Sequence, residues 1–249
     1  MGLEKIFKTK TIIPYVMHKV VMEEITSWED IKIEILKELI LEIKCNQPHL
    51  DNKKIDHILT FDDGFESDYE IVFPILKKNN LMGIFFIVPD WIGLPGYLNW
   101  RQVNEMVLGG MEIGSHSLTH RPMNQLNLSQ IKNEFLSSRN IIEDKIGNKV
   151  NMFSYPYGIR NKMLDNLALE SGYQFLWGSN HGVINKNSVY FPRNSINSKT
   201  NLDEIKKIIY PTLQKKSLWY VEDFSKYFLK IIFGQNLYKN LRNCVFNDE

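Results

Sequence analysis

Two adjacent carboxylates, Asp62 and Asp63, are the first candidates for chemistry in this sequence. They follow residues 58–61 (ILTF), which are typical of a short buried strand, and Gly64 permits a sharp exit of the chain. Neighbouring side chains of a strand point to opposite faces, so two working carboxylates in succession need the irregular backbone of a strand end. The alternative is an Asp-Gly turn that closes a hairpin, which is the commoner meaning of an isolated Asp-Gly.

A pair of histidines offers ligands of a second kind. His116 and His120 follow a short apolar segment and stand at i and i+4, a spacing that lets both rings hold one ion from a helical turn or tight loop. An isolated H-x-x-x-H pattern is more often structural. Together with the acidic strand end, however, the pair completes a set of one carboxylate and two imidazoles with an open position, as a catalytic zinc ion needs. The remaining aspartate is then available as a general base.

These motifs resemble those of the NodB-type polysaccharide deacetylases, carbohydrate esterase family 4. The family pattern T-F-D-D-G stands at residues 60–64 and H-S-x-x-H at residues 116–120. The third family block, usually F-R-P-P-Y-G, is F-S-Y-P-Y-G at residues 153–158. Order and spacing agree from residue 12 to residue 196. The resemblance implies an α/β fold, a distorted (β/α) barrel that commonly has seven parallel strands.

The resemblance also implies a role for each matching residue. The expected ligands of a divalent metal, with Zn²⁺ as the expected ion, are Asp63, His116 and His120. Asp62 is expected to be the general base that activates water toward the acetamide of an N-acetylated sugar. The backbone N–H of Tyr157 is expected to stabilise the oxyanion, in a loop fixed by Pro156, and both residues are expected to contact the substrate.

The sequence departs from the family pattern at several positions. Ser154 replaces the third-block arginine that orients the catalytic aspartate in many members. Arg193 is the candidate to supply that guanidinium from another strand or to contact the substrate, with an exposed surface arginine as the alternative. Asn180 stands near the fourth-block aspartate, whereas Trp177 of that block is retained and expected to contact the substrate. The histidine of the fifth block is missing, so His181 is the candidate general acid, with an ordinary loop histidine as the alternative.

Strand-like and helix-like segments alternate along the chain, which predicts a parallel sheet. Helices are expected over residues 31–43, 69–79, 100–108, 129–146 and 161–171. The first of them is expected to be capped by Ser27 with Asp30. All three motifs follow predicted strands, and parallel α/β folds place their chemistry at the C-terminal strand ends.

Three parts of the chain are expected: residues 1–54, a strand and helix packed on the barrel; residues 55–200, the deacetylase-like core; and residues 201–249, a helical tail. The tail is aromatic and basic between residues 219 and 242, with Gly234 expected to break it into two helices. Such a segment suits either a helix lying on a membrane surface or a helix packed back on the barrel.

Composition restricts the function further. The chain has 249 residues and a formal net charge of +1, so no electrostatic argument favours nucleic acid as a partner. Cys45 and Cys244 are the only cysteines, which argues against a disulfide framework and suits a reducing compartment. No apolar run is long enough for an export signal or a membrane span. A cytoplasmic location is therefore expected, with peripheral contact at the inner membrane face through the tail as an addition.

The expected function is metal-dependent N-deacetylation of an N-acetylated sugar, as an intracellular precursor in surface polysaccharide biosynthesis. The sugar is expected to be nucleotide-linked, lipid-linked or part of an oligosaccharide. The alternative is a carbohydrate-binding protein that kept the fold and lost turnover. Ser154 and the missing fifth-block histidine favour that alternative, whereas the complete set of two aspartates and two histidines favours the enzyme.

Overall fold

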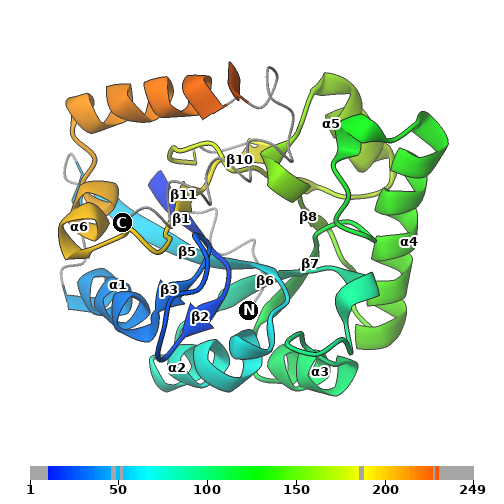
Figure 1. Ribbon diagram of the computed structural model, residues 1–249, viewed down its shortest axis with the longest axis horizontal. Helices are drawn as coiled ribbons and strands as arrows, with labels where there is room; N and C mark the ends of the chain where they lie inside the picture. The colour runs from blue at the N-terminus through cyan, green and yellow to red at the C-terminus, as the bar shows by residue number, and fades with distance from the viewer. Residues whose placement is uncertain (1–10, 46–48, 51–52, 185–187, 227, 230–249) are drawn as a thin grey trace.

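Figure 1 shows the computed structural model, in which a curled sheet lies at the centre with helices over its outer side. The structure describes residues 11–45, 49–50, 53–184, 188–226 and 228–229. Eight strands run parallel in the order β10-β9-β8-β7-β6-β5-β1-β11, and β4 pairs antiparallel with β5. A separate pair is formed by β2 and β3. The strands are β1 (Thr11–Met17), β2 (Val20–Val21), β3 (Ile31–Lys32), β4 (His49–Leu50), β5 (Lys53–Asp63), β6 (Gly83–Ile87), β7 (Glu112–Ser115), β8 (Met152–Ser154), β9 (Phe175–Trp177), β10 (Tyr190–Phe191) and β11 (Asn194–Ser195).

The expected barrel-like α/β fold is confirmed, but it has eight parallel strands where seven were expected. The strands β10 and β11 have two residues each, which is too short to produce a periodic pattern in the sequence. They lie at opposite ends of the sheet, yet only Pro192 and Arg193 separate them. Three Cα steps span at most about 11 Å. The curled sheet therefore almost closes at this seam, and Arg193 lies in it.

The helices lie close to their predicted positions, except that the cap predicted for the first helix is wrong. They are α1 (Ile33–Cys45), α2 (Phe73–Lys78), α3 (Trp100–Leu108), α4 (Leu128–Ile146), α5 (Lys162–Glu170) and α6 (Leu202–Ile209). A π-helical turn (Asp68–Val72) precedes α2, where one continuous helix was expected. The predicted cap of the first helix is wrong, because Asp30 accepts hydrogen bonds from the backbone N–H groups of Thr26 (2.7 Å) and Ser27 (2.9 Å) and so closes a turn before β3.

Strand alternation divides the buried side chains between the two faces of the sheet. Leu59 and Phe61 of β5 belong to the large core between the sheet and the helices. Ile58, two residues before Thr60, belongs to a smaller inner cluster. The other buried members of that inner cluster are Ile12, Ile84, Phe86, Met152, Trp177, Ile184 and Phe191. By the same alternation Asp62 faces inward, so the apolar filling of the barrel ends in a polar layer.

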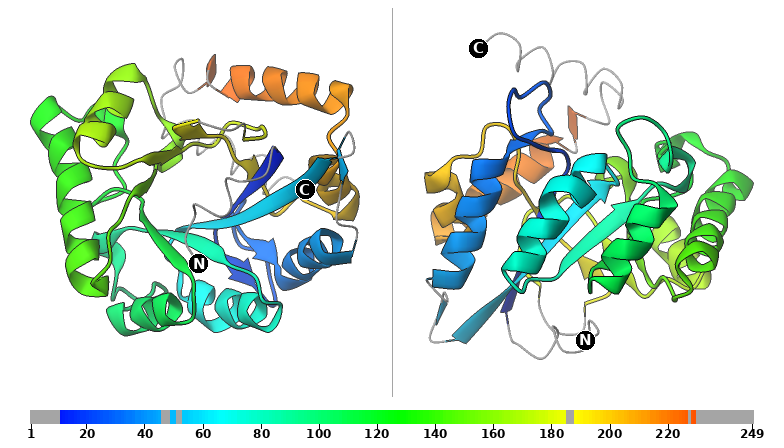
Figure 2. Two further views of the ribbon diagram at one scale, coloured as in Figure 1. Left: turned by 180° about the vertical axis from the view of Figure 1, so that it is seen from behind. Right: turned by 90° about the horizontal axis from the view of Figure 1, so that it is seen from below.

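The chain outside the predicted core takes part in the same architecture. The strand β1, which belongs to the part expected to pack on the barrel, lies within the sheet between β5 and β11. Residues 213–226 form a further helix, which runs along the side of the sheet that carries β10 and β11 (Figures 1 and 2). Its Trp219 is buried. The tail beyond residue 229, with Gly234 and Cys244, lies outside the described residues. Within the described residues, no helix combines the length and apolar character needed to cross a membrane.

Candidate active site

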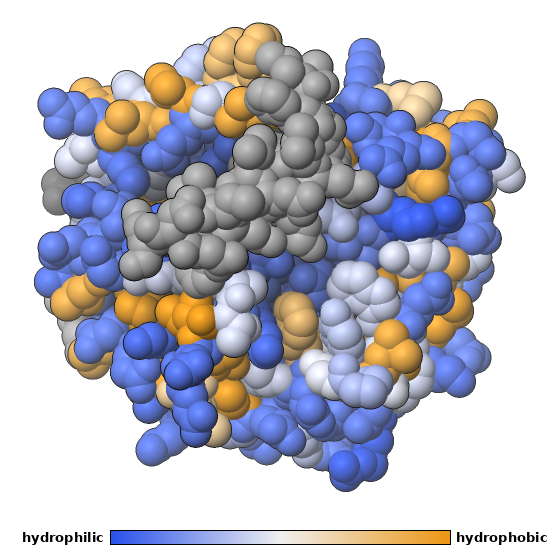
Figure 3. Space-filling model, viewed as in Figure 1, coloured by the Kyte–Doolittle hydropathy of each residue, from blue (hydrophilic) through white to orange (hydrophobic). Residues whose placement is uncertain are grey.

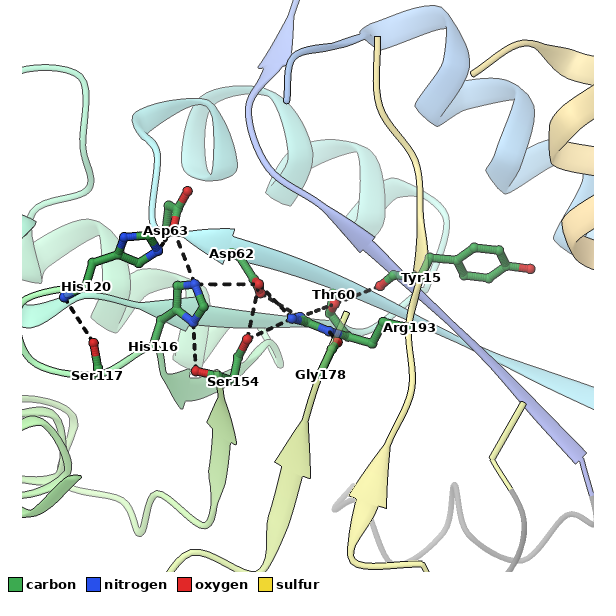
Figure 4. Close-up of polar contacts among 10 residues, drawn as sticks. All are labelled: Tyr15, Thr60, Asp62, Asp63, His116, Ser117, His120, Ser154, Gly178 and Arg193. Atoms are coloured by element: carbon green, nitrogen blue, oxygen red, sulfur yellow. Dashed lines mark hydrogen bonds and ion pairs between the residues drawn. The ribbon is translucent and has the colours of Figure 1, made fainter. Parts of the chain in front are cut away.

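The three predicted metal ligands come together at the C-terminal ends of β5 and β7 (Figure 4). Asp63 Oδ1 lies 3.5 Å from His116 Nε2 and 3.3 Å from His120 Nε2. All the candidate ligand atoms of this group lie within 4.8 Å of one another. His116 and Asp63 are buried, and the side chain of His120 is only 11% exposed.

The backbone around this group adopts an uncommon conformation. Positive φ angles occur at Asp63 (79°), Ser117 (65°), His120 (60°) and Tyr157 (58°), four of the five such non-glycine residues in the part of the chain that the structure describes. This region of φ is costly for residues with a Cβ and is concentrated at functional sites. Ser117 Oγ accepts a hydrogen bond from the backbone N–H of His120 at 3.0 Å, which supports the turn between the two histidines.

The hydrogen bonds of the histidines fit a bound cation. His116 Nδ1 lies 2.8 Å from the backbone carbonyl oxygen of Ser154, which can only accept, so Nδ1 carries a proton and Nε2 is the ring nitrogen that faces Asp63. Asp63 Oδ1 is buried and has no hydrogen-bond partner among the described residues. A cation between this oxygen and the ring nitrogens would give the carboxylate a partner. One carboxylate and two imidazoles are a donor set that suits Zn²⁺ and related divalent metals.

The protonation of His120 agrees with a ligand role. Burial, followed by the charge of His116, lowers the pKa of His120 to about 2. Its imidazole is therefore neutral at pH 7, which is the form that binds metals. Burial raises the pKa of Asp63, against the opposing charges of His18 and His116. A cation bound beside Asp63 would favour the ionised carboxylate.

Asp62 lies on the other side of His116 and is held by a buried guanidinium. Arg193 Nη1 donates to Asp62 Oδ1 at 2.6 Å and Nη2 donates to Asp62 Oδ2 at 2.7 Å. Burial alone would raise the pKa of Asp62, but the charge of Arg193, with a smaller contribution from His116, outweighs it and holds the pKa well below its usual range. Asp62 Oδ2 lies 3.7 Å from His116 Nε2, so an ionised carboxylate stands directly beside the candidate metal position.

Arg193 compensates for the serine at position 154. Its Nη2 also donates to Ser154 Oγ at 2.7 Å, and Ser154 Oγ donates to Asp62 Oδ2 at 3.1 Å. The small serine thus leaves room for the guanidinium of Arg193, which lies at the seam between β10 and β11. Further donors are directed to Thr60 Oγ1 (3.0 Å) and to the backbone carbonyl of Gly178 (2.7 Å). Arg193 is only 1% exposed, so the predicted alternative of a surface arginine is wrong. Its guanidinium binds Asp62, as the first predicted role requires, and its contact with a substrate stays a prediction.

A cavity of about 770 Å³ opens over these groups. Its lining includes Asp62, Asp63 and both ligand histidines, together with the predicted residues Tyr157, His181 and Arg193. Pro156 is buried and does not line the cavity. Trp177 does not line it either, because it is fully buried in the inner cluster, where it stacks on Phe191 with ring centroids 4.8 Å apart. The expected substrate contact by Trp177 is therefore not supported by its position.

Aromatic rings line one side of this cavity. The ring centroid of His120 lies 4.7 Å from that of Tyr157 and 4.7 Å from that of Trp91. Tyr97 stacks on Phe65 at 5.2 Å and lies 5.1 Å from Trp91. Trp91 and Tyr97 come from the loop between β6 and α3. Aromatic faces and edges of this kind provide apolar contact area beside polar groups, as small-ligand sites commonly do.

Two further acidic residues were not predicted. Glu134 of α4 is 1% exposed and accepts hydrogen bonds from the backbone N–H groups of Leu118 and Thr119, both at 2.9 Å, between the two ligand histidines. Asp223, on the helix of residues 213–226, accepts a hydrogen bond from His181. No local sequence motif marks either residue, because each accepts hydrogen bonds from a loop that is distant from it in the sequence.

Comparison with known proteins agrees with this geometry. The sequence model of the polysaccharide deacetylase family matches residues 49–176. A putative polysaccharide deacetylase of Bacillus subtilis, YxkH, is 31% identical over 47% of this chain and 42% of its own length. The peptidoglycan-N-acetylglucosamine deacetylase PgdA of Listeria monocytogenes is 31% identical over 45% of this chain and 23% of its own length. The matches thus span less than half of these two relatives.

A solved structure supports the fold over a longer stretch. The deacetylase PplD of Streptococcus pyogenes, determined in complex with acetate, superposes with a TM-score of 0.73. The match covers 82% of this chain and 100% of that chain at 18% identity, so it bears on the fold alone. Because the family sequence model covers half of the chain, and its motifs converge on one cavity, the chain belongs to the NodB-type polysaccharide deacetylase family.

Proposed function

We propose that this protein is a metal-dependent N-deacetylase that hydrolyses the acetamide of an N-acetylated sugar. The observation that carries the proposal is the juxtaposition of the ligand set Asp63, His116 and His120 with the buried, arginine-held Asp62 at one cavity. The family to which the chain belongs supports the reaction class. The volume of the cavity lies within the range of about 300–1,000 Å³ that is usual for small-ligand sites.

Each residue has a defined task in this reaction. A divalent cation held by Asp63, His116 and His120 would supply a Lewis acid beside the acetamide carbonyl and the attacking water. Asp62 is ionised at neutral pH, so it can take the proton of the water that adds to the carbonyl carbon. The backbone N–H of Tyr157 would donate to the developing oxyanion. Cleavage of the C–N bond leaves acetate and an amine, and the amine nitrogen must gain a proton.

The substrate is part of the proposal. Relatives are named as deacetylases of N-acetylglucosamine in peptidoglycan, and one is named as a bifunctional xylanase/deacetylase. We propose an N-acetylated sugar of surface polysaccharide, with a nucleotide- or lipid-linked precursor as the form expected from the sequence. The competing function is a carbohydrate-binding protein without turnover. Two departures from the family pattern support it, Ser154 in place of the third-block arginine and the missing fifth-block histidine. The contacts of Arg193 with Asp62 supply the absent guanidinium and weaken the first of them.

Acetate release tests this proposal. Purified protein loaded with Zn²⁺ is incubated with N-acetylglucosamine oligosaccharides, peptidoglycan fragments and UDP-N-acetylglucosamine, and free acetate is measured. Asp62→Asn should lower the rate by on the order of 10²–10⁴-fold, as loss of a general base does, while the metal content stays unchanged. Sugar binding without acetate release from any of these substrates would favour the carbohydrate-binding protein. Release within a few fold of wild type by Asp62→Asn would remove Asp62 as the base.

Contact with a membrane is a further part of the proposal. The helix of residues 213–226 and its continuation expose the apolar side chains of Leu213, Tyr220, Val221, Phe224 and Phe228. Figure 3 shows apolar side chains, mixed with polar ones, along the edge of the molecule where this helix runs. Co-sedimentation with anionic vesicles at low and high salt tests this contact, because screening weakens the electrostatic part. A cytoplasmic location is likewise proposed, and cell fractionation tests it.

A further inference from the structure

The helix of residues 213–226 lies beside the cavity, and its Asp223 accepts two hydrogen bonds from His181. The backbone N–H of His181 donates to Asp223 Oδ2 at 2.8 Å, and His181 Nδ1 lies 2.8 Å from Asp223 Oδ1. The side chains of His181 and Asp223 are 8% and 14% exposed. One carboxylate therefore holds both the loop and the ring of this histidine in a largely desolvated position.

The contacts of the ring fix its tautomer and its plane. A carboxylate can only accept, so the proton shared with Asp223 belongs to His181 Nδ1, and Nε2 is the nitrogen left for other partners. Trp219 of the same helix stacks on the ring, with centroids 5.6 Å apart and an interplanar angle of 8°. Nε2 lies 3.8 Å from Glu222 Oε2, outside hydrogen-bond distance.

The loop that carries His181 is tied to the arginine that holds Asp62. Arg193 donates from Nε to the carbonyl of Gly178 and from its backbone N–H to the carbonyl of Asn180, both at 2.7 Å. His181 follows directly and lines the same cavity as Asp62 and the ligand set. The hydrogen bonds thus form one continuous path from Asp62 through Arg193 and this loop to His181 and Asp223.

We infer that Asp223 is a positioning residue of the active site, and that the helix of residues 213–226 completes the site from outside the segment matched by the family. This inference rests on the proposed deacetylase function. In it, His181 gives the proton on Nε2 of its imidazolium to the nitrogen of the leaving amine as the C–N bond breaks. Water supplies OH to the acetyl carbon, and its proton passes to Asp62. The products are acetate and the free amine. Asp223 keeps Nδ1 protonated, so that Nε2 is the nitrogen that exchanges protons.

The requirement for a leaving-group proton provides the test. Hydrolysis of an N-acetylated sugar needs protonation of the amine, whereas 4-nitrophenyl acetate releases a stable phenolate that needs no acid. His181→Gln should lower kcat for the acetamide by on the order of 10²–10⁴-fold. Asp223→Asn should show a large part of the same decrease in kcat, because its amide group cannot accept from both His181 N–H groups. Both variants should retain most of the activity of the wild type toward the aryl ester.

A control and a second readout keep the inference falsifiable. Asp144→Asn changes a carboxylate that is 79% exposed on α4 and should behave as wild type on both substrates. The ¹⁵N spectrum of the His181 ring should show a protonated Nδ1 in the wild type and a changed tautomer in Asp223→Asn. If Asp223→Asn lowers both activities alike, or neither, or leaves the tautomer unchanged, the inference is wrong. If the wild type releases no acetate from acetamides, the proposed function fails, and the tautomer measurement still decides the positioning role.

Discussion

Replacing Arg193 by methionine should destabilise the protein strongly, because it leaves a charge buried without its partner. Met has a similar length but no donors, so Arg193→Met removes the two hydrogen bonds to Asp62 and those to Ser154, Thr60 and Gly178. Asp62 is only 3% exposed, so water can replace few of them. Breaking a buried ion pair typically costs about 3–5 kcal/mol, a large part of the roughly 5–15 kcal/mol that stabilises most domains.

Urea denaturation of the metal-free protein at pH 7 measures this cost. The double variant Asp62→Asn/Arg193→Met should recover a substantial part of the loss, since it also removes the unpaired charge. Arg101→Met is the matched control: the Arg101 side chain is 75% exposed, and its pair with Glu105 is worth about 0–1 kcal/mol. A loss below about 1 kcal/mol for Arg193→Met, or no recovery in the double variant, would contradict the buried-pair reasoning.

Two other predictions concern buried carboxyl groups. Glu134→Gln should weaken zinc binding by about 10–100-fold in a chelator competition, because the neutral amide loses the second carboxylate oxygen, which accepts from Thr119 Oγ1, and the negative charge that faces Arg121. The exposed Glu170→Gln is the control, and equal affinities would contradict the role of Glu134. Burial, followed by the charges of Asp63 and Asp62, raises the pKa of Asp68 well above its usual range. The folded state then keeps this proton to higher pH than the unfolded chain, so stability falls as pH rises above about 4, the usual Asp value. Asp68→Asn should remove that fall, so its stability relative to wild type should grow from pH 4.5 to pH 8 in EDTA, and a constant difference would show that Asp68 does not titrate in this way.

The sequence predicts the centre of this site because its parts are local. The pairs Asp62-Asp63 and His116-x-x-x-His120 follow strands, and parallel strands bring their C-terminal ends together. Two residues around the centre depend on contacts over long sequence separations. Arg193 meets Asp62 across 131 residues and Asp223 meets His181 across 42, so no local spacing reports them. For Arg193, the sequence left three roles open: a partner of the catalytic aspartate, a substrate contact or an exposed surface arginine.

Strand and helix prediction failed where the local signal was weak or ambiguous. The two-residue strands β10 and β11 carry no periodicity, although they place Arg193 at the seam of the barrel. Asp30 has the composition of a cap, but its carboxylate closes a turn in place of a helix start. Trp177 matches a family block, yet strand alternation directs it into the inner cluster. Each outcome depends on the three-dimensional environment of the residue.

Titration of zinc into the metal-free protein, with acetate release from an N-acetylated oligosaccharide as the readout, tests both the metal site and the reaction. The ligand set of Asp63, His116 and His120 predicts that activity rises with added metal and levels off at about one equivalent per chain. His116→Ala should bind less metal and release no acetate at the same metal concentrations. Acetate release that is independent of metal, or equal metal content and activity in wild type and His116→Ala, would contradict a metal-dependent deacetylase centred on these residues.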